Sequence, residues 1–215
     1  MIEYLVLASG VLFLLFLLPW RGRNHSAILG WAAMVLFLIA EIPYYLSLNN
    51  ILYPTLAVLA IPFLFVTGRR LLREDPAILT LSRGAAVAFL IYAPFAYLPA
   101  LGDLLIGVVT GQVVWLLDSV GRPAPLLAWN LIGRNGFQIE IILACTGIQS
   151  MAIMLGVAGA VRTAIRQKAL AFLLVVPTIY LLNLLRNTFV IIAYTEQWFP
   201  YLPEIASNGE WGYES

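Results

Sequence analysis

The sequence is poor in charged residues. Only 11% of its 215 residues are Asp, Glu, Lys or Arg, whereas 62% are hydrophobic. Soluble domains carry roughly a quarter charged residues, so this chain lacks the side chains needed to cover a water-facing surface. The net charge of +1 gives no electrostatic basis for binding nucleic acid. The composition therefore predicts an all-α polytopic membrane protein that forms one membrane-embedded domain over residues 1–215.

Cysteine and histidine each occur once. Cys145 has no second cysteine with which to form a disulfide inside the chain. His25 is the one histidine, and no cluster of metal-ligand residues, phosphate-binding loop or Ser-His-Asp pattern is present. We therefore expect no metal and no nucleotide cofactor.

Six apolar stretches are long enough to cross a bilayer as helices. They cover approximately residues 4–20, 26–46, 51–68, 84–100, 145–161 and 169–193. Nine of the twelve Lys and Arg residues fall in or beside the first, third and fifth connections: Arg21, Arg23, Arg69, Arg70, Arg73, Arg83, Arg162, Arg166 and Lys168. Cytoplasmic loops carry such an excess, so these connections are predicted to be cytoplasmic and both termini to lie outside.

The segment 101–144 is predicted to lie on the outer side with structure of its own. Apolar residues recur at helical spacing from Leu105 to Val120, which favours an amphipathic helix on the outer membrane interface. The pair Asn135-Gly136 between apolar runs then predicts a short outer β-hairpin whose second strand leads to Cys145. An irregular cap is the alternative.

Cys145 and Arg186 are the residues on which a catalytic site could be built. Counted from the cytoplasmic Arg162 and Lys168, they lie 17 and 18 residues away, rises of roughly 25 and 27 Å. They are thus expected at nearly one depth near the outer boundary, on adjacent helices. Cys145 would open its helix, where the N–H groups favour a thiolate, and an arginine at membrane depth is a functional candidate by default.

Less specific roles compete with this one. Cys145 could be a packed small hydrophobe, and Arg186 could be paired structurally with Glu140 or Glu196. A Cys145–His25 pair is not expected, because His25 falls in the first cytoplasmic connection.

The sequence around these two residues resembles the exosortase/archaeosortase family. The resemblance rests on Ala144-Cys145-Thr146-Gly147-Ile148-Gln149-Ser150 and on Asn183-Leu184-Leu185-Arg186-Asn187, and the Cys-Thr-Gly-Ile-Gln form is most similar to archaeosortases. It implies a membrane cysteine transpeptidase whose substrates are secreted proteins with a C-terminal sorting signal, of Pro-Gly-Phe type, followed by a transmembrane helix and a basic tail. The trimmed protein would pass to an acceptor, a membrane lipid.

The resemblance also implies roles for individual residues. Cys145 would form a thioester with the substrate, and Arg186 would stabilise the thiolate or the oxyanion. Thr146, Gln149, Asn183 and Asn187 are the residues expected to contact substrate. A third family residue, Arg or His on a further span, has no counterpart before Ser215, so that span is expected to be missing from this chain and the proton acceptor stays unassigned.

Two functions of other classes remain open on the sequence. A helical transporter or channel could use Arg186 as an anion site, although the first, third and fourth spans carry almost no internal charge. A non-catalytic membrane assembly partner would only pack Cys145.

Overall fold

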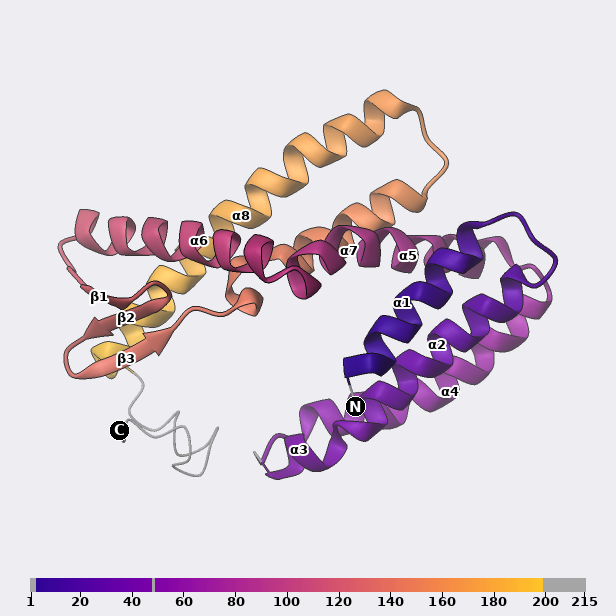
Figure 1. The fold of residues 1–215 in the computed structure, drawn as a ribbon, viewed down its shortest axis with the longest axis horizontal. Helices are drawn as coiled ribbons and strands as arrows, with labels where there is room; N and C mark the ends of the chain where they lie inside the picture. The colour runs from indigo at the N-terminus through magenta and orange to yellow at the C-terminus, as the bar shows by residue number, and fades with distance from the viewer. Residues whose placement is uncertain (1–2, 48, 199–215) are drawn as a thin grey trace. The chain divides into compact units, whose positions relative to one another are not determined.

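The computed structural model describes residues 3–47 and 49–198, which form helices and one small sheet (Figure 1). The chain divides into two compact units, described separately below. In the first, residues 3–90 and 156–162, the helices are α1 (Glu3–Leu17), α2 (Arg23–Ala40), α3 (Ile42–Ser47), α4 (Leu52–Leu72) and most of α5 (Pro76–Tyr97). The second, residues 91–155 and 163–198, contains α6 (Pro99–Ser119), β1 (Leu126–Ala128), β2 (Leu131–Arg134), β3 (Phe137–Glu140), the 3₁₀ turn η1 (Leu143–Thr146) and α8 (Ile165–Thr195). Helix α7 (Ile148–Ala160) begins in the second unit and ends in the first.

The helices match a membrane protein in length and surface. Five helical segments of the described chain are long and apolar enough to cross a bilayer, and α1 and α7 are shorter apolar helices. Large apolar side chains remain exposed on them, such as Leu36, Leu59 and Leu181. Such surfaces suit lipid rather than water. Each of the six predicted spans has a helical counterpart, and the predicted all-α polytopic class is confirmed.

The first unit packs through small residues. The Ser9 hydroxyl on α1 donates to the carbonyl of Gly30 on α2 at 2.8 Å. A Cβ on Gly156 of α7 would lie only 2.5 Å from the carbonyl oxygen of Gly84 on α5. Because both positions lack side chains, these helices approach through their backbones, as membrane helices commonly do.

Two of the three basic connections meet at one end of this first unit. Asn24, beside the α1–α2 connection, donates to Glu74 in the α4–α5 connection at 3.3 Å. The methyl group of Ala160, the last residue of α7, lies 3.7 Å from the position of a Cβ on Gly84, next to Arg83. The end of α7 therefore lies beside Arg83, about two turns after the start of α5. The helix is 13 residues long, which corresponds to about 20 Å.

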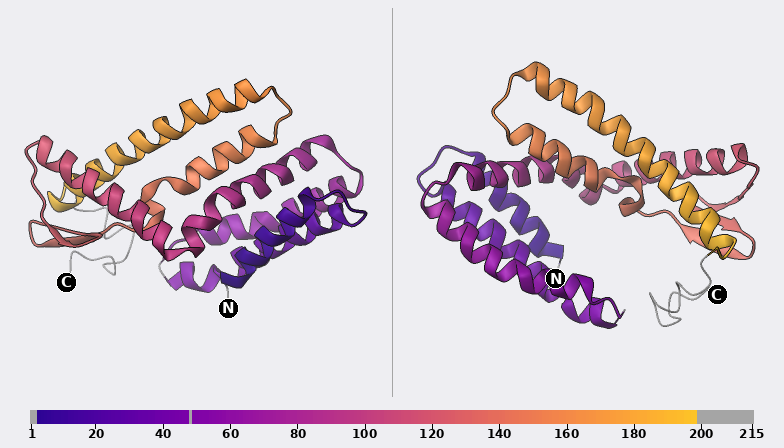
Figure 2. Two further views of the ribbon diagram at one scale, coloured as in Figure 1. Left: turned by 45° about the horizontal axis from the view of Figure 1, so that its top comes forward. Right: turned by 180° about the vertical axis from the view of Figure 1, so that it is seen from behind.

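In the second unit α6 crosses α8 steeply, and the sheet lies beside the carboxyl ends of both helices (Figure 2). Ile106, Val109 and Val113 of α6 share one core with Leu184 and Ile191 of α8. The Tyr180 hydroxyl of α8 donates to Gln112 of α6 at 2.6 Å within this contact. The crossing fixes the part of α8 that carries the candidate site.

The helix predicted within residues 101–144 is present as α6 and begins at Pro99. Its exposed side is apolar as well, with Leu104, Val108 and Trp115, so the helix is less amphipathic than predicted. By length and hydropathy it also qualifies as a span. Its position on the outer interface stays a prediction.

The hairpin prediction is confirmed. β2 and β3 pair antiparallel, with Arg134 opposite Phe137, and Asn135 and Gly136 form the two-residue turn with φ of 51° and 86°. Both values lie in the left-handed region, as the hairpin-favouring type I′ turn requires. A third strand, β1, which the sequence did not predict, pairs with β2 on the other side.

Candidate active site

Cys145 lies in the short turn that joins the sheet to α7. It is the third residue of η1 and half-buried, and its N–H donates to the Ile142 carbonyl at 2.8 Å. Gly147 follows with φ of 80°, and α7 starts at Ile148. The cysteine therefore precedes the helix rather than opening it, and its own amide is not available to a substrate.

Thr146 belongs to the interior of this turn. Its side chain is fully buried, and its hydroxyl donates to the Leu143 carbonyl at 2.7 Å. The same oxygen accepts from the Ile148 N–H at 3.4 Å, as a capping group does at the start of a helix. Its hydroxyl therefore serves the turn that holds Cys145.

Two asparagines of α8 hold the peptide group of Cys145. The side-chain amides of Asn183 and Asn187 both donate to the Cys145 carbonyl, the second at 2.7 Å. The two residues are four apart on a helix and therefore lie one above the other on the same face. Both are buried, so neither bond competes with bulk water. Their amides position the nucleophile candidate against α8.

Gly147 allows this close approach. A Cβ at Gly147 would lie 3.1 Å from Cγ of Asn183, and φ of 80° is strained for any residue with a side chain. The Cys-Thr-Gly spacing therefore follows from the shape of the turn: a buried capping hydroxyl, then a glycine against which the asparagine packs.

Arg186 lies on α8 between the two asparagines and is exposed. Three residues along a helix place it about 60° around the axis from Asn183, and it is at the level of the bound Cys145 carbonyl. No described residue forms a hydrogen bond or ion pair with its guanidinium; Glu140 accepts instead from Asn130, and Glu196 from other arginines. The structural pairing considered as an alternative is thus not found in the described chain.

Gln149 is exposed in the first turn of α7, and its side-chain amide donates to the Tyr92 hydroxyl at 3.3 Å. The residues predicted to contact substrate are therefore gathered around the turn that holds Cys145. Asn183 and Asn187 bond to the Cys145 carbonyl, and Gln149 follows Cys145 by four residues. His25 lies in the first turn of α2 in the other unit.

A charged cluster that the sequence did not predict joins the hairpin to the end of α8. The Arg134 guanidinium contacts both Glu196, at 2.8 Å, and the hydroxyl of Thr195, at 2.7 Å. Arg122 also donates to Glu196, and the Asn135 amide donates to the Thr195 carbonyl at 3.2 Å. Arg134 is only 8% exposed, so the cluster fixes the sheet firmly beside α8.

The Arg134 hydrogen bond holds the pKa of Glu196 below its ordinary value of 4.5, and the Trp198 hydrogen bond and the charge of Arg122 act in the same direction, against partial desolvation. A carboxyl with a lowered pKa adds stability above its ordinary pKa and loses it as the pH falls through the lowered value. We therefore expect the thermal midpoint of the detergent-solubilised protein to decrease as the pH is lowered below about 4.5. Glu196→Gln should be less stable at neutral pH and should lose this pH dependence; an unchanged dependence would argue against the cluster.

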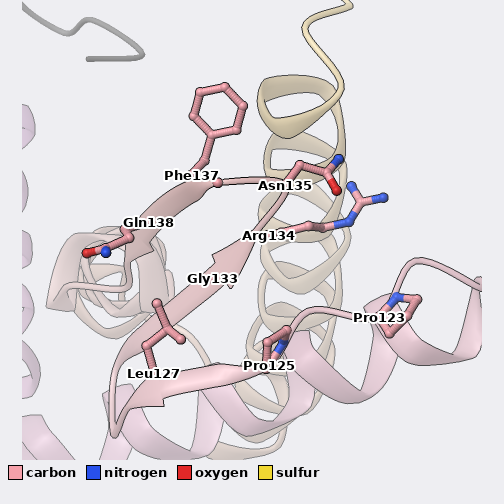
Figure 3. Close-up of a pocket in the computed structure, with 9 residues that line it drawn as sticks. Pro123, Pro125, Leu127, Gly133, Arg134, Asn135, Phe137 and Gln138 are labelled. Carbon is pink, nitrogen blue, oxygen red and sulfur yellow. The ribbon is translucent and has the colours of Figure 1, made fainter. Parts of the chain in front are cut away.

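A shallow hollow of about 360 Å³ lies on the sheet (Figure 3). Leu127 and Gln138 line it on either side of Gly133, while Arg134 and Asn135 are directed toward α8. Cys145 is not among its lining residues, so the hollow is a feature of the sheet and not the site of the thiol.

Comparison with known proteins assigns the family. A family model described as "Transmembrane exosortase (Exosortase_EpsH)" matches residues 3–201. The chain belongs to this family. It is 29% identical over 189 residues to a protein of Haloferax volcanii named Archaeosortase A, covering 79% of this chain and 62% of that one. It is 27% identical over 192 residues to a protein of Natronomonas pharaonis with the same name, covering 84% and 61%.

The chain thus spans about three fifths of the length of these curated relatives. No solved structure matches it. The family resemblance inferred from the Cys145 and Arg186 segments is confirmed by both comparisons.

Proposed function

We propose that this exosortase-family chain carries the nucleophile and the anion-binding group of a membrane cysteine transpeptidase. The observation that supports it most is the turn that presents Cys145, held through its carbonyl by Asn183 and Asn187 beside the exposed Arg186. A thiol on a turn that is held in place, and a guanidinium at the same level of α8 with no partner among the described residues, are groups that acyl transfer can use.

The proposed reaction moves an acyl group twice. The Cys145 thiolate, its proton given to solvent, attacks the carbonyl carbon of the scissile peptide bond. The C–N bond breaks, the amine leaves with a proton from solvent, and a thioester remains on Cys145. A hydroxyl or amine of the acceptor, a membrane lipid in our proposal, then attacks the thioester and regenerates the thiolate.

Arg186 is assigned to the oxyanion. The backbone N–H of a cysteine nucleophile can itself bind the oxyanion. Here the Cys145 N–H already donates to the Ile142 carbonyl. A guanidinium cannot act as a base because it does not lose its proton in proteins. It presents a fork of N–H donors with a full charge, which suits the negative oxygen that develops during attack.

The roles proposed for the neighbouring residues follow from their contacts. The side-chain amides of Asn183 and Asn187 donate to the Cys145 carbonyl, so we assign both residues to positioning the nucleophile. We assign the buried Thr146 the same role because its hydroxyl bonds within the turn. Gln149 is exposed and is the one we retain as a substrate contact.

We place the thiol at the outer boundary of a cell membrane. Two basic connections of the first unit lie at one end, which the positive-inside rule assigns to the cytoplasm. Helix α7 ends beside the basic residue Arg83 and, over its length of about 20 Å, leads back to Ile148, three residues after Cys145. The substrate in this position is the sorting-signal segment of a secreted protein, of Pro-Gly-Phe type, just outside its transmembrane helix.

The test is a covalent intermediate. The purified chain in lipid nanodiscs is incubated with a peptide that contains Pro-Gly-Phe, a transmembrane helix and a basic tail. Mass spectrometry should find the acyl part of the peptide on Cys145, and hydroxylamine should remove it, because thioesters are cleaved by this nucleophile. An adduct on another residue, or none at all, would contradict the proposed function.

A further inference from the structure

β3 has one paired edge and one open edge. The strand order is β1-β2-β3, so β2 is central and β3 pairs on one side only within the described chain. It leads through Ile141 and Ile142 into the turn that holds Cys145. An open edge strand is a template for a further strand.

The direction of each peptide group along β3 follows from the ladder. A two-residue turn makes Arg134 and Phe137 a hydrogen-bonded pair, and such pairs alternate along an antiparallel ladder. Consistently, the Ile141 N–H donates back to the Asn130 carbonyl at 2.8 Å. The Gly133 N–H points the other way, to Pro125 of the β1 side, at 2.9 Å.

The N–H and C=O groups of Gln138 and Glu140 therefore point outward from the open edge. Both residues are exposed, and no described residue bonds to their outward backbone groups. The Glu140 side chain is already engaged, since it accepts from Asn130 at 3.0 Å. What the edge offers is a short row of backbone donors and acceptors.

From this geometry we propose that the open edge of β3 binds the extended segment of the substrate that precedes the cleaved bond, as an added β-strand. The inference rests on the proposed function and deepens it. Glu140 lies five residues before Cys145, a span of at most about 17 Å, so a substrate strand of a few residues connects this edge to the thiol.

The chain direction of the added strand is determined. β3 runs toward Cys145, and the acyl segment of the substrate also ends at Cys145. The two strands therefore run parallel. In a parallel ladder only every second residue of the added strand bonds to a given edge. Backbone recognition of this kind tolerates varied side chains in the segment that precedes the cleaved bond.

The decisive experiment changes the substrate backbone and leaves the protein intact. Single amides upstream of the cleaved bond are replaced by esters, one position at a time, which removes one N–H donor without changing the side chain. Acylation of Cys145 should slow by about three- to tenfold, the worth of one net hydrogen bond, at alternate positions only. Equal effects at successive positions, or none, would overturn the inference while leaving the adduct and the proposed function standing. Absence of any adduct with the all-amide peptide would overturn both.

A variant pair tests the same contact from the protein side. Gln138→Pro removes an outward N–H that the sheet does not use, and proline is tolerated at such edge positions. It should slow acylation by about three- to tenfold, whereas Gln138→Ala, which keeps the N–H, should not. In Cys145→Ala bound to the uncut peptide, residue-resolved hydrogen exchange should show new protection at Gln138 and Glu140. Equal behaviour of the two variants together with unchanged exchange would also overturn the inference.

Discussion

We expect a Cys145→Ala variant to bind the proposed sorting-signal substrate and leave it uncut. Loss of the nucleophile in a triad hydrolase costs on the order of 10⁶-fold in kcat, so neither adduct nor processed product should be detectable. The measurement is a processing assay in nanodiscs, with the product resolved by mass spectrometry.

This variant is a clean test because of how the turn is held. Asn183 and Asn187 donate hydrogen bonds to the backbone carbonyl of residue 145, which alanine retains. The half-buried side chain loses only its thiol group. The thermal midpoint should therefore stay close to that of the parent protein. Processing that survives Cys145→Ala would rule out the transpeptidase and leave a packing role for the thiol.

Replacing Arg186 by alanine will lower the rate of acylation by about 10²- to 10³-fold, as loss of one oxyanion donor does elsewhere. The loss should fall on kcat with little change in KM, since the oxyanion exists only during reaction. Arg186→Lys keeps the charge without the planar fork and should recover only part of the rate. Single-turnover acylation of Cys145 is the measurement.

The structure supplies a matched control for Arg186. Its guanidinium is exposed and unpaired among the described residues, so its removal leaves no buried charge behind. Asn187→Ala, one residue away, instead removes a buried bond to Cys145 and should lower both the thermal midpoint and the rate. An Arg186→Ala enzyme with unchanged kcat, especially one that loses anion flux, would favour a transport site over a transpeptidase.

Local signals in the sequence predicted much of this arrangement. Asn135-Gly136 is enough to predict a hairpin because only a few residues accept left-handed φ at successive positions. The polar residues Asn183, Arg186 and Asn187 on an apolar helix indicate a site because such side chains are costly in lipid. Positions counted from the basic connections then placed Cys145 and Arg186 at one level.

What the sequence could not predict were partners far apart along the chain. Arg134 and Glu196 are separated by 62 residues, and neither has a neighbour that indicates the other. The acceptor for Asn183 and Asn187 is a backbone carbonyl, which every residue has. The resemblance therefore implied that they contact substrate, and the sequence did not indicate their hydrogen bonds to Cys145. The third strand was missed because β1 has only three residues and no alternating pattern.

The shortness of α7 has a consequence for the acceptor. Thirteen residues rise about 20 Å, whereas the hydrocarbon core of a bilayer measures about 30 Å. Hydrophobic mismatch of this size draws the lipid headgroups inward or leaves a wet recess above the start of the helix. In the proposed transfer, a headgroup hydroxyl drawn to this depth would lie near the level of the acyl group on Cys145.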